Sequence, residues 1–440
     1  MAADLNGRAA EEVEILDLSH EGRGVARIGG KAVFVDGALP GERVRVRVAK
    51  RRRQFDEAVL EQVLVPSAQR VAPRCAHFGV CGGCSLQHLD PAAQLAAKER
   101  QLLENLERIG AVAPRTVFAP LRGPQWAYRR RARLGVKYVH KKGRVLAGFR
   151  ERDKPYLADL RSCEVLEARF RDLPAELAAL VQSLGIRDRV PQVEVAAGDR
   201  AAALVFRVMQ PPDAADLEKL EAFGAAHDLQ IHLQTGGLDT VRPLRADYPA
   251  LAYDLDGGAL SLEFGPVDFI QVNREVNLAM IDAAMGLLAP EATDSVLDLF
   301  CGLGNFTLPV SRRAGQVVGV EGDAGLVAKA RANAVRNAVG NARFFTENLF
   351  EPKAFGRWSE ERYDRVLLDP PRAGAVECLP RMAHWRPRRV VYISCHPGSL
   401  ARDAGILVRD QGFELIGAGV MDMFPHTTHV ESIAVFEPAV

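Results

Sequence analysis

The feature that most constrains the fold is an alternation of short apolar runs and helical segments that starts at about residue 267. Helical segments such as Gly325–Val339 separate the runs. Strands that alternate with helices in this way are typical of a parallel sheet with helices on both faces. We therefore predict an α/β domain over residues 266–440. Its expected strands are Val296–Phe300, Val317–Val320, Arg343–Phe345, Val366–Leu368 and Val390–Ser394.

A glycine turn follows the first of these strands. The segment Asp298-Leu-Phe-Cys-Gly-Leu-Gly-Asn-Phe306 has two glycines, Gly302 and Gly304, which allow the backbone to turn tightly and approach a ligand. Thr307 stands where a dinucleotide fingerprint would have its third glycine, and Glu321 ends the next strand, where it can bind ribose hydroxyls. The pattern suits an adenosyl ligand without a pyrophosphate, such as S-adenosylmethionine. A tight turn with no ligand is the alternative.

Reactive side chains stand at the ends of the later strands, which is the edge where open α/β sheets bind ligands. Asp369-Pro-Pro-Arg372 ends the fourth strand, and Cys395 follows the fifth. Because Pro397 is suited to the first turn of a helix, we expect the helix N-terminus to lower the pKa of Cys395. Glu431 precedes a last strand, Ser432–Phe436, and can act as a base. An inert cysteine and a capped turn are the alternatives.

Charge is distributed unevenly along the chain. The 440 residues carry 57 basic and 56 acidic side chains, but residues 1–150 hold 27 basic and 15 acidic ones. This asymmetry indicates either an N-terminal part that faces nucleic acid or a solvated basic surface. No apolar run reaches the roughly 18 residues of a membrane span, and charged residues near the N-terminus do not fit a signal peptide. We expect a cytoplasmic protein with no membrane partner.

Four cysteines outside the predicted sheet form a separate group. Cys75, Cys81 and Cys84 have the spacing Cys-x5-Cys-x2-Cys, and 78 residues separate Cys84 from Cys163. In a cytosolic chain such cysteines indicate metal binding or catalysis rather than disulfides. Four thiolates suit either Zn²⁺ or an iron–sulfur cluster. The uneven three-plus-one spacing favours a [4Fe–4S] cluster and leaves zinc open.

The N-terminal residues 1–68 are predicted to form a small β-barrel. Strand-like runs alternate with glycine turns, and Arg43, Arg45 and Arg47 alternate with three valines. A period of two places the valines inside and the arginines on one outer face. An OB-like barrel of about five strands with a cationic face fits this pattern. A barrel whose charged side chains only face the solvent is the alternative.

Residues 69–265 are predicted to form a central α+β domain that carries the cysteines. Asp90-Pro91 opens an amphipathic helix that extends to about Ile109. From Trp126 to Phe149 the chain is basic with interleaved aromatic residues, a combination that single-stranded RNA-binding surfaces use. An ordinary pair of strands is the alternative.

Taken together, these segments resemble the bacterial RNA uracil-C5 methyltransferases, and most closely their cluster-containing members that act on 23S ribosomal RNA. The resemblance covers nearly the whole chain and includes the barrel and the four cysteines. It implies an N-terminal TRAM domain and a Rossmann-like class I S-adenosylmethionine-dependent methyltransferase sheet. The motifs that carry it are Phe269-Ile-Gln-Val-Asn273, Asp298 to Phe306, Asp369-Pro-Pro-Arg-Ala-Gly374, Ser394-Cys395 and Asp422-Met-Phe-Pro-His-Thr-Thr-His-Val-Glu431.

The resemblance also implies residue roles. Cys395 is the expected nucleophile and Glu431 the base that takes the C5 proton. His396 stands where an asparagine is expected after the nucleophile, and Cys301 and Cys378 are expected to be structural. The residues implied to contact S-adenosylmethionine are Gln271, Phe300, Asn305, Glu321, Asn348 and Asp369, and the implied ligands of a [4Fe–4S] cluster are Cys75, Cys81, Cys84 and Cys163.

The implied activity is methyl transfer from S-adenosylmethionine to C5 of one uridine in 23S ribosomal RNA, by a monomer. Uracil C5 is too weak a nucleophile to react unaided, so a thiolate adds at C6 and a base later removes the C5 proton. Two alternatives stay open. One is a uridine-C5 methyltransferase of transfer RNA, and the other is a catalytically silent RNA-binding factor in ribosome assembly.

Overall fold

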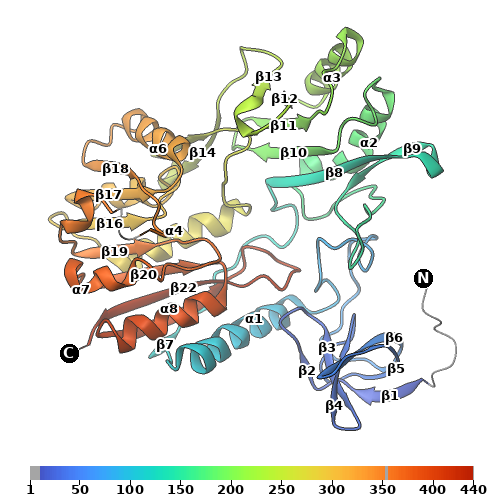
Figure 1. The fold of residues 1–440 in the computed structure, drawn as a ribbon, viewed down its shortest axis with the longest axis horizontal. Helices are drawn as coiled ribbons and strands as arrows, with labels where there is room; N and C mark the ends of the chain where they lie inside the picture. The colour runs from blue at the N-terminus through green and yellow to red at the C-terminus, as the bar shows by residue number, and fades with distance from the viewer. Residues whose placement is uncertain (1–9, 352–354, 440) are drawn as a thin grey trace.

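The protein is described by a computed structural model over residues 10–351 and 355–439. Along the chain it forms an N-terminal sheet, a central sheet with two helices, and a large C-terminal sheet with helices on both faces (Figure 1). Residues 1–9, 352–354 and 440 belong to the first and third predicted domains and lie outside the described residues. The predicted division at 68 and 265 stays a prediction.

The N-terminal sheet has six strands. They are β1 (Glu11–Glu14), β2 (Asp17–Leu18), β3 (Gly24–Ile28), β4 (Lys31–Val35), β5 (Arg43–Arg51) and β6 (Phe55–Val65). Their order is β1-β5-β6-β4-β3-β2. The valines of β5 are buried and its arginines point outward, as the alternation predicts.

The outer face of this sheet is mixed in charge rather than cationic, which corrects the sequence prediction. Arg45 pairs with Glu12 at 3.0 Å, and Arg47 pairs with Glu61 at 2.7 Å. These glutamates lie on neighbouring strands, so the sequence of β5 alone does not reveal them. Residues 1–66 hold 11 basic and 11 acidic side chains. The positive excess therefore belongs to residues 67–150, with 16 basic and 4 acidic side chains.

The central sheet also has six strands, in the order β13-β12-β11-β10-β8-β9. Two helices, α2 (Leu173–Ser183) and α3 (Ala214–Ala226), accompany it, and the hairpin of β14 (Leu251–Leu255) and β15 (Leu260–Phe264) leads to the next domain. The six strands are β8 (Arg131–Val139), β9 (Arg144–Gly148), β10 (Gln192–Ala197), β11 (Ala202–Arg207), β12 (Gln230–Gln234) and β13 (Val241–Pro243).

The basic segment at β8 divides into an internal and an external part. Arg130 is buried and pairs with Asp199 at 2.9 Å, and Arg131 pairs with Glu194 at 3.0 Å. These arginines stabilise the fold. The cations at the tip of the β8–β9 hairpin, among residues 137–144, are exposed, and the hairpin projects from the edge of the molecule (Figure 1).

The C-terminal sheet has eight strands in the order β18-β17-β16-β19-β20-β22-β21-β7. Strands β16 to β20 are parallel, and β22 runs antiparallel between β20 and β21. All five strands predicted here are present with small shifts at their ends. They are β16 (Ser295–Leu299), β17 (Gln316–Glu321), β18 (Ala342–Thr346), β19 (Arg365–Leu368) and β20 (Arg389–Ser394), followed by β21 (Phe413–Met421) and β22 (Glu431–Pro438).

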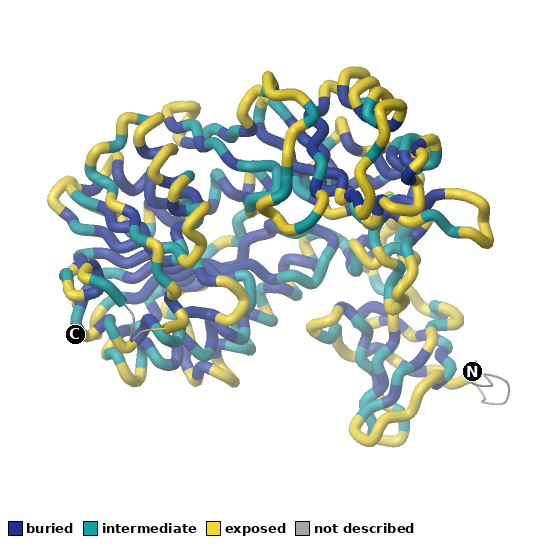
Figure 2. Tube along the Cα trace, turned by 45° about the horizontal axis from the view of Figure 1, so that its top comes forward, coloured by how far each residue is buried: buried dark blue, intermediate teal, exposed yellow. Residues whose placement is uncertain are grey.

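Two apolar cores lie on opposite faces of this sheet. Successive strand residues point to alternate faces, so Val296 joins one core while Leu297 and Leu299 join the other. One face is covered by α4 (Arg274–Leu288), α5 (Thr307–Ser311) and α6 (Ala324–Arg336), and the other by α1 (Pro91–Asn105), α7 (Met382–Trp385) and α8 (Pro397–Arg409). The strands form a continuous buried layer in Figure 2.

Helix α1 lies far from the C-terminal sheet in sequence but packs on it. Asp90 caps the helix by accepting hydrogen bonds from the N–H groups of Ala92 and Ala93, and Pro91 opens it, as predicted. After α1 the chain adds the edge strand β7 (Thr116–Val117), which runs parallel to β21. The segment that follows the three clustered cysteines is thereby anchored to the same sheet as the predicted catalytic residues.

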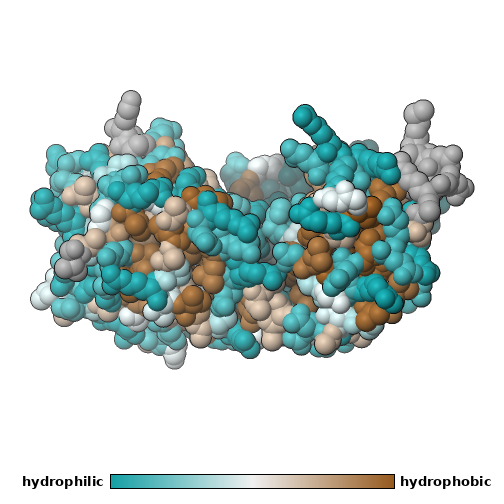
Figure 3. Space-filling model, turned by 90° about the horizontal axis from the view of Figure 1, so that it is seen from below, coloured by the Kyte–Doolittle hydropathy of each residue, from teal (hydrophilic) through white to brown (hydrophobic). Residues whose placement is uncertain are grey.

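The surface seen from below carries separate hydrophobic patches among hydrophilic side chains (Figure 3). Within the described ranges, no helix has the length and apolar character needed to span a membrane.

Candidate active site and cysteine pocket

A cleft of about 550 Å³ opens at the carboxyl ends of the parallel strands. It brings together all eight residues predicted for cofactor binding and catalysis, although the first and the last of them are 160 residues apart in the sequence. These residues are Gln271, Phe300, Asn305, Glu321, Asn348, Asp369, Cys395 and Glu431.

The glycine turn after β16 shapes one wall of the cleft. Phe300, Gly302 and Gly304 all have positive φ angles, of 63°, 55° and 99°. The φ angle of Gly304 is one that L side chains rarely adopt, and a Cβ atom there would also lie 2.4 Å from the Leu308 side chain, so the position favours glycine. Glu321 holds the turn from the next strand, because its Oε2 accepts a hydrogen bond from the Gly302 N–H at 3.1 Å.

Two residues that the sequence did not reveal hold Asn305 in place. The Tyr253 hydroxyl donates to Asn305 Oδ1 at 3.0 Å. The amides of Asn277 and Asn305 exchange two hydrogen bonds, of 3.2 and 3.0 Å. Tyr253 and Asn277 lie in ordinary strand and helix segments, so no local motif marks them.

Cys395 lies between the end of β20 and the start of α8. His396 is the N-cap residue of this helix, because its Nδ1 accepts a hydrogen bond from the Ser399 N–H at 3.1 Å. An asparagine would do the same, so the substitution noted in the sequence preserves the cap. The imidazole must be unprotonated at Nδ1 to accept this bond, and burial lowers the pKa of His396 accordingly.

The prediction of a lowered thiol pKa is wrong for this state of the protein. Burial raises the pKa of Cys395 to about 11, and the negative charges of Glu431 and Asp369 add to the effect. The helix N-terminus does not offset these contributions. Arg372 favours the thiolate and lines the same cleft, and across the described part of the chain it has no ion-pair partner.

The cleft is rich in carboxylates. Its lining includes Glu321, Asp369 and Glu431. Burial raises the pKa of Asp369 well above its ordinary value, and the negative charges of Glu431, Asp298 and Glu321 add to this shift. Crowded carboxylates in a partly buried site favour a positively charged ligand. S-adenosylmethionine has such a charge at its sulfonium centre, directly beside the methyl group that it donates.

Glu431 opens β22 at the end of a segment that we call the base loop, residues 422–431. Within it, His429 Nε2 lies 3.2 Å from Glu431 Oε1. The loop is anchored to α1 by the buried pair of Lys98 and Asp422 at 2.8 Å. Lys98 also donates to the carbonyl of Phe424 at 3.0 Å. The sequence motif contains His429 and Phe424, but the sequence alone indicates no role for either.

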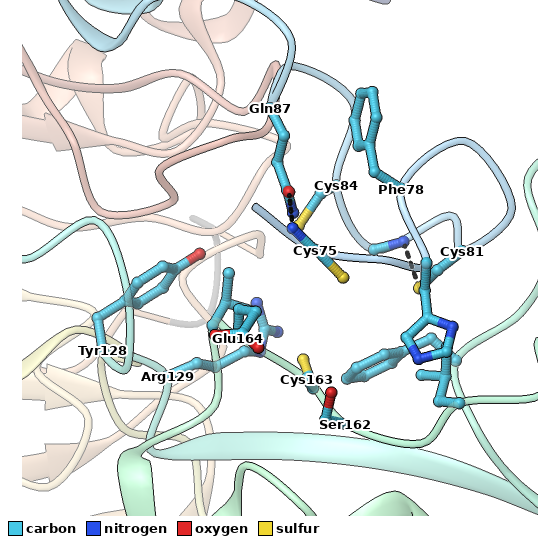
Figure 4. Close-up of a pocket in the computed structure, with 15 residues that line it drawn as sticks. Cys75, Phe78, Cys81, Cys84, Gln87, Tyr128, Arg129, Ser162, Cys163 and Glu164 are labelled. Carbon is cyan, nitrogen blue, oxygen red and sulfur yellow. Dashed lines mark hydrogen bonds between the residues drawn. The ribbon is translucent and has the colours of Figure 1, made fainter. Parts of the chain in front are cut away.

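A second cavity, of about 150 Å³, is lined by the four remaining predicted residues, Cys75, Cys81, Cys84 and Cys163. We call it the cysteine pocket. In Figure 4, Cys163 approaches this cavity from the opposite side to the loop that carries the other three. Gln87 Oε1 accepts a hydrogen bond from the Cys75 N–H at 3.1 Å, which fixes the start of the loop. Burial raises the pKa of Cys81 to about 11 and that of Cys84 to about 12.

The cavity and the base loop share contacts. The N–H groups of Ser85 and Leu86 both donate to the His426 carbonyl at 2.9 Å. The Tyr128 hydroxyl, from the cavity wall, donates to the Pro425 carbonyl at 3.2 Å. Arg129 lines the cavity and lies over the Phe424 ring, 5.8 Å from its centroid. The cysteine pocket thus borders the loop that carries Glu431.

Comparisons with known proteins agree with these features. The family model of tRNA (uracil-5-)-methyltransferases matches residues 90–438, and that of the TRAM domain matches residues 8–60. A curated relative in Stenotrophomonas maltophilia, named 23S rRNA (uracil(1939)-C(5))-methyltransferase RlmD, is 52% identical over 98% of both chains. One in Alkalilimnicola ehrlichii with the same name is 52% identical over 97% of this chain and 96% of its own.

A solved structure with a similar fold is the tRNA (uracil-54, C5)-methyltransferase of Pyrococcus abyssi in complex with S-adenosyl-L-homocysteine. It has a TM-score of 0.72 and 22% sequence identity, and the alignment covers 97% of this chain and 100% of that one. At this identity the likeness shows the fold alone.

The sheet, its cleft and the TRAM domain define an S-adenosylmethionine-dependent RNA methyltransferase. More narrowly, the chain belongs to the RNA uracil-C5 methyltransferase family. The fold class and the type of enzyme predicted from the sequence are thereby confirmed.

Proposed function

We propose that this enzyme methylates C5 of one uridine in 23S ribosomal RNA through a covalent intermediate. The observation that carries the proposal is the meeting of Cys395 and Glu431 in one cleft with the six residues predicted to hold S-adenosylmethionine. The names of relatives that are 52% identical over 98% of the chain support the choice of RNA. Transfer RNA is the second candidate, because the matching family model and the similar solved structure carry tRNA names.

In the proposed reaction the target uridine leaves its stack and enters the cleft. The sulfur of Cys395 adds to C6. C5 of the resulting enolate then attacks the methyl group of S-adenosylmethionine, which releases S-adenosylhomocysteine. Glu431 then takes the proton from C5. The electrons of that C–H bond re-form the C5–C6 double bond, and the S–C6 bond breaks with its electrons on sulfur.

In this scheme the positive charge of S-adenosylmethionine also helps Cys395 to lose its proton. The resting thiol is protonated at neutral pH, because its pKa is raised to about 11. A sulfonium ion bound among Glu321 and Asp369 would offset the negative charge around Cys395. Arg372 acts in the same direction. The thiolate would then form mainly when S-adenosylmethionine is already bound.

We further propose that the cysteine pocket holds a [4Fe–4S] cluster through Cys75, Cys81, Cys84 and Cys163. The donor set fits, because four thiols surround one cavity whose other walls include Phe78 and Phe149. Within the described ranges, no group of three or more His, Cys, Asp or Glu side chains is placed so that it could hold a metal ion. Four thiolates suit either a [4Fe–4S] cluster or a zinc ion, and the uneven three-plus-one spacing along the chain favours the cluster. A bound cluster would link the cysteine loop to Cys163 on the opposite wall.

The RNA is proposed to cross the central domain. The exposed cations near the tip of the β8–β9 hairpin include Lys137 and Lys141, which could contact phosphates. We also propose that the chain acts as a monomer in the cytoplasm, where ribosomal RNA is made, and that residues 1–68, 69–265 and 266–440 are its working units.

The test is to map 5-methyluridine in RNA from cells that lack this protein. We expect one site in 23S ribosomal RNA to lose its methyl group and regain it when the wild-type gene is restored. Loss from transfer RNA instead would support the second candidate. If no RNA loses 5-methyluridine and the purified protein does not bind S-adenosylmethionine, an RNA-binding assembly factor becomes the better account.

A further inference from the structure

The contact between His429 and Glu431 has no place in the scheme above. We propose that His429 is a positioning residue, which donates its Nε2–H to Glu431 and so keeps the buried carboxylate charged and directed at the substrate. The inference rests on the proposed role of Glu431 as base. It assigns a task to a side chain that the covalent scheme leaves unused.

The geometry of the pair supports a donated hydrogen bond. His429 lies two residues before Glu431, which is the first residue of β22. His429 Nε2 lies 3.2 Å from Glu431 Oε1. The structure gives Glu431 Oε2 no hydrogen-bond partner within the described ranges. One oxygen is therefore held while the other stays free to accept a proton.

The imidazole is itself held by the base loop. Its ring meets the ring of Phe424 edge-on, with centroids 4.5 Å apart and an interplanar angle of 67°. The His429 N–H donates to Thr427 Oγ1 at 3.2 Å, and that hydroxyl donates to the Phe424 carbonyl at 2.9 Å. These contacts fix the ring before any substrate arrives, which favours a positioning role.

The electrostatic surroundings explain why Glu431 needs such a donor. The charged or titratable groups that face it are Cys395 and Asp369 across the cleft, Arg372, Lys98 from α1, and His429. Burial raises the pKa of Glu431, and the His429 contact is the strongest influence in the opposite direction. Lys98 is already paired with Asp422, and Arg372 makes no ion pair among the described residues. The hydrogen bond from His429 is the direct one.

The proton balance is simple under this assignment. The C5 proton moves to Glu431, and His429 keeps its own proton throughout. The new carboxylic acid returns its proton to water after the product leaves. Without His429 the carboxyl group would stay protonated to a higher pH, so the methylated adduct would form but resolve slowly at neutral pH.

The test compares three variants of His429. The amide of His429→Gln can still donate a hydrogen bond to Glu431. The side chain of His429→Asn is too short to do so, and His429→Leu has no donor. Full-length holoenzyme is mixed with S-adenosylmethionine and a 23S ribosomal RNA fragment in a single turnover. The covalent adduct is followed on denaturing gels from pH 6 to 10.

We expect the Leu and Asn variants to accumulate methylated adduct at pH 7, and the pH midpoint of its resolution to rise by about one unit or more. The Gln variant should behave like wild type. Equal impairment of all three variants at every pH would overturn the inference in favour of a purely structural role, and wild-type behaviour of all three would also overturn it. If wild type and Glu431→Gln form no adduct at all, the proposed function itself fails.

Discussion

The protein has two sites with thiols, and these sites differ in the neighbours of the thiols. Cys395 faces a cleft of about 550 Å³ with carboxylates and Arg372 around it, whereas Cys75, Cys81, Cys84 and Cys163 surround a cavity of about 150 Å³ with aromatic walls. Burial raises the pKa of thiols in both places. A nucleophile must gain and lose charge in each turnover, so it needs access and charged neighbours. Ligands of a resident group need enclosure instead.

The largest expected effect comes from removing the proposed nucleophile. Cys395→Ala should lower methyl transfer by a factor of about 10⁴ or more, because no covalent step remains. It should leave the iron content of the holoenzyme unchanged, because Cys395 does not line the cysteine pocket. Tritiated methyl incorporation and iron analysis measure the two effects. Cys378→Ala, at a buried cysteine outside the cleft, is the control and should keep its activity.

The second largest effect tests how the base loop, which borders the cleft and the cysteine pocket, is anchored. Lys98→Met leaves the Asp422 carboxylate buried without its partner, and breaking such a pair costs about 3–5 kcal/mol. Urea unfolding should show this loss. Arg100→Met on the same helix removes only an exposed pair with Asp17 and should cost about 1 kcal/mol or less. Similar losses for both variants would mean that the loop is not anchored through Lys98.

The third effect concerns the proposed cluster ligands. Cys84→Ser should abolish iron and sulfide binding, and the buried hydroxyl should lower stability by about 1–3 kcal/mol. The matched substitution Cys395→Ser should keep both iron and sulfide. Anaerobic purification followed by metal analysis distinguishes the two. One equivalent of zinc and no iron in the wild type would replace the cluster with a zinc site.

The smallest effect concerns the resting thiol. Since the pKa of Cys395 is raised to about 11, its alkylation by iodoacetamide should rise about tenfold per pH unit between pH 7 and 10. Bound S-adenosylmethionine should speed alkylation at pH 7 relative to S-adenosylhomocysteine, which has a similar shape but no sulfonium charge. Mass spectrometry of the Cys395 peptide measures both rates. A plateau already reached at pH 7 would show that the helix N-terminus controls the thiol after all.

Part of the active-site cleft could be predicted from the sequence alone. The strand-end motifs predict the cleft because parallel strands place their carboxyl ends along one edge, so Glu321, Asp369 and Cys395 meet whatever the loops do. Contacts between distant segments are not encoded locally. The support of Asn305 by Tyr253 is one example.

The two sequence predictions that failed have the same origin. The thiol pKa depends on carboxylates from other strands, and the charge of the N-terminal sheet depends on glutamates that lie opposite the arginines of β5. Both predictions considered only the residues next to the group in question. Chemistry at a strand end could be read from the sequence, but its electrostatic surroundings required the assembled fold.

The central claim is that Cys395 and Glu431 act on one uracil ring. The most direct measurement uses Glu431→Gln, which should permit attack and methyl transfer but stall elimination. After reaction with S-adenosylmethionine and substrate RNA, a denaturing gel should show an RNA-linked protein band, and peptide mapping should place a 5-methyluridine adduct on Cys395. The absence of this band, or an adduct on another residue, would contradict the account.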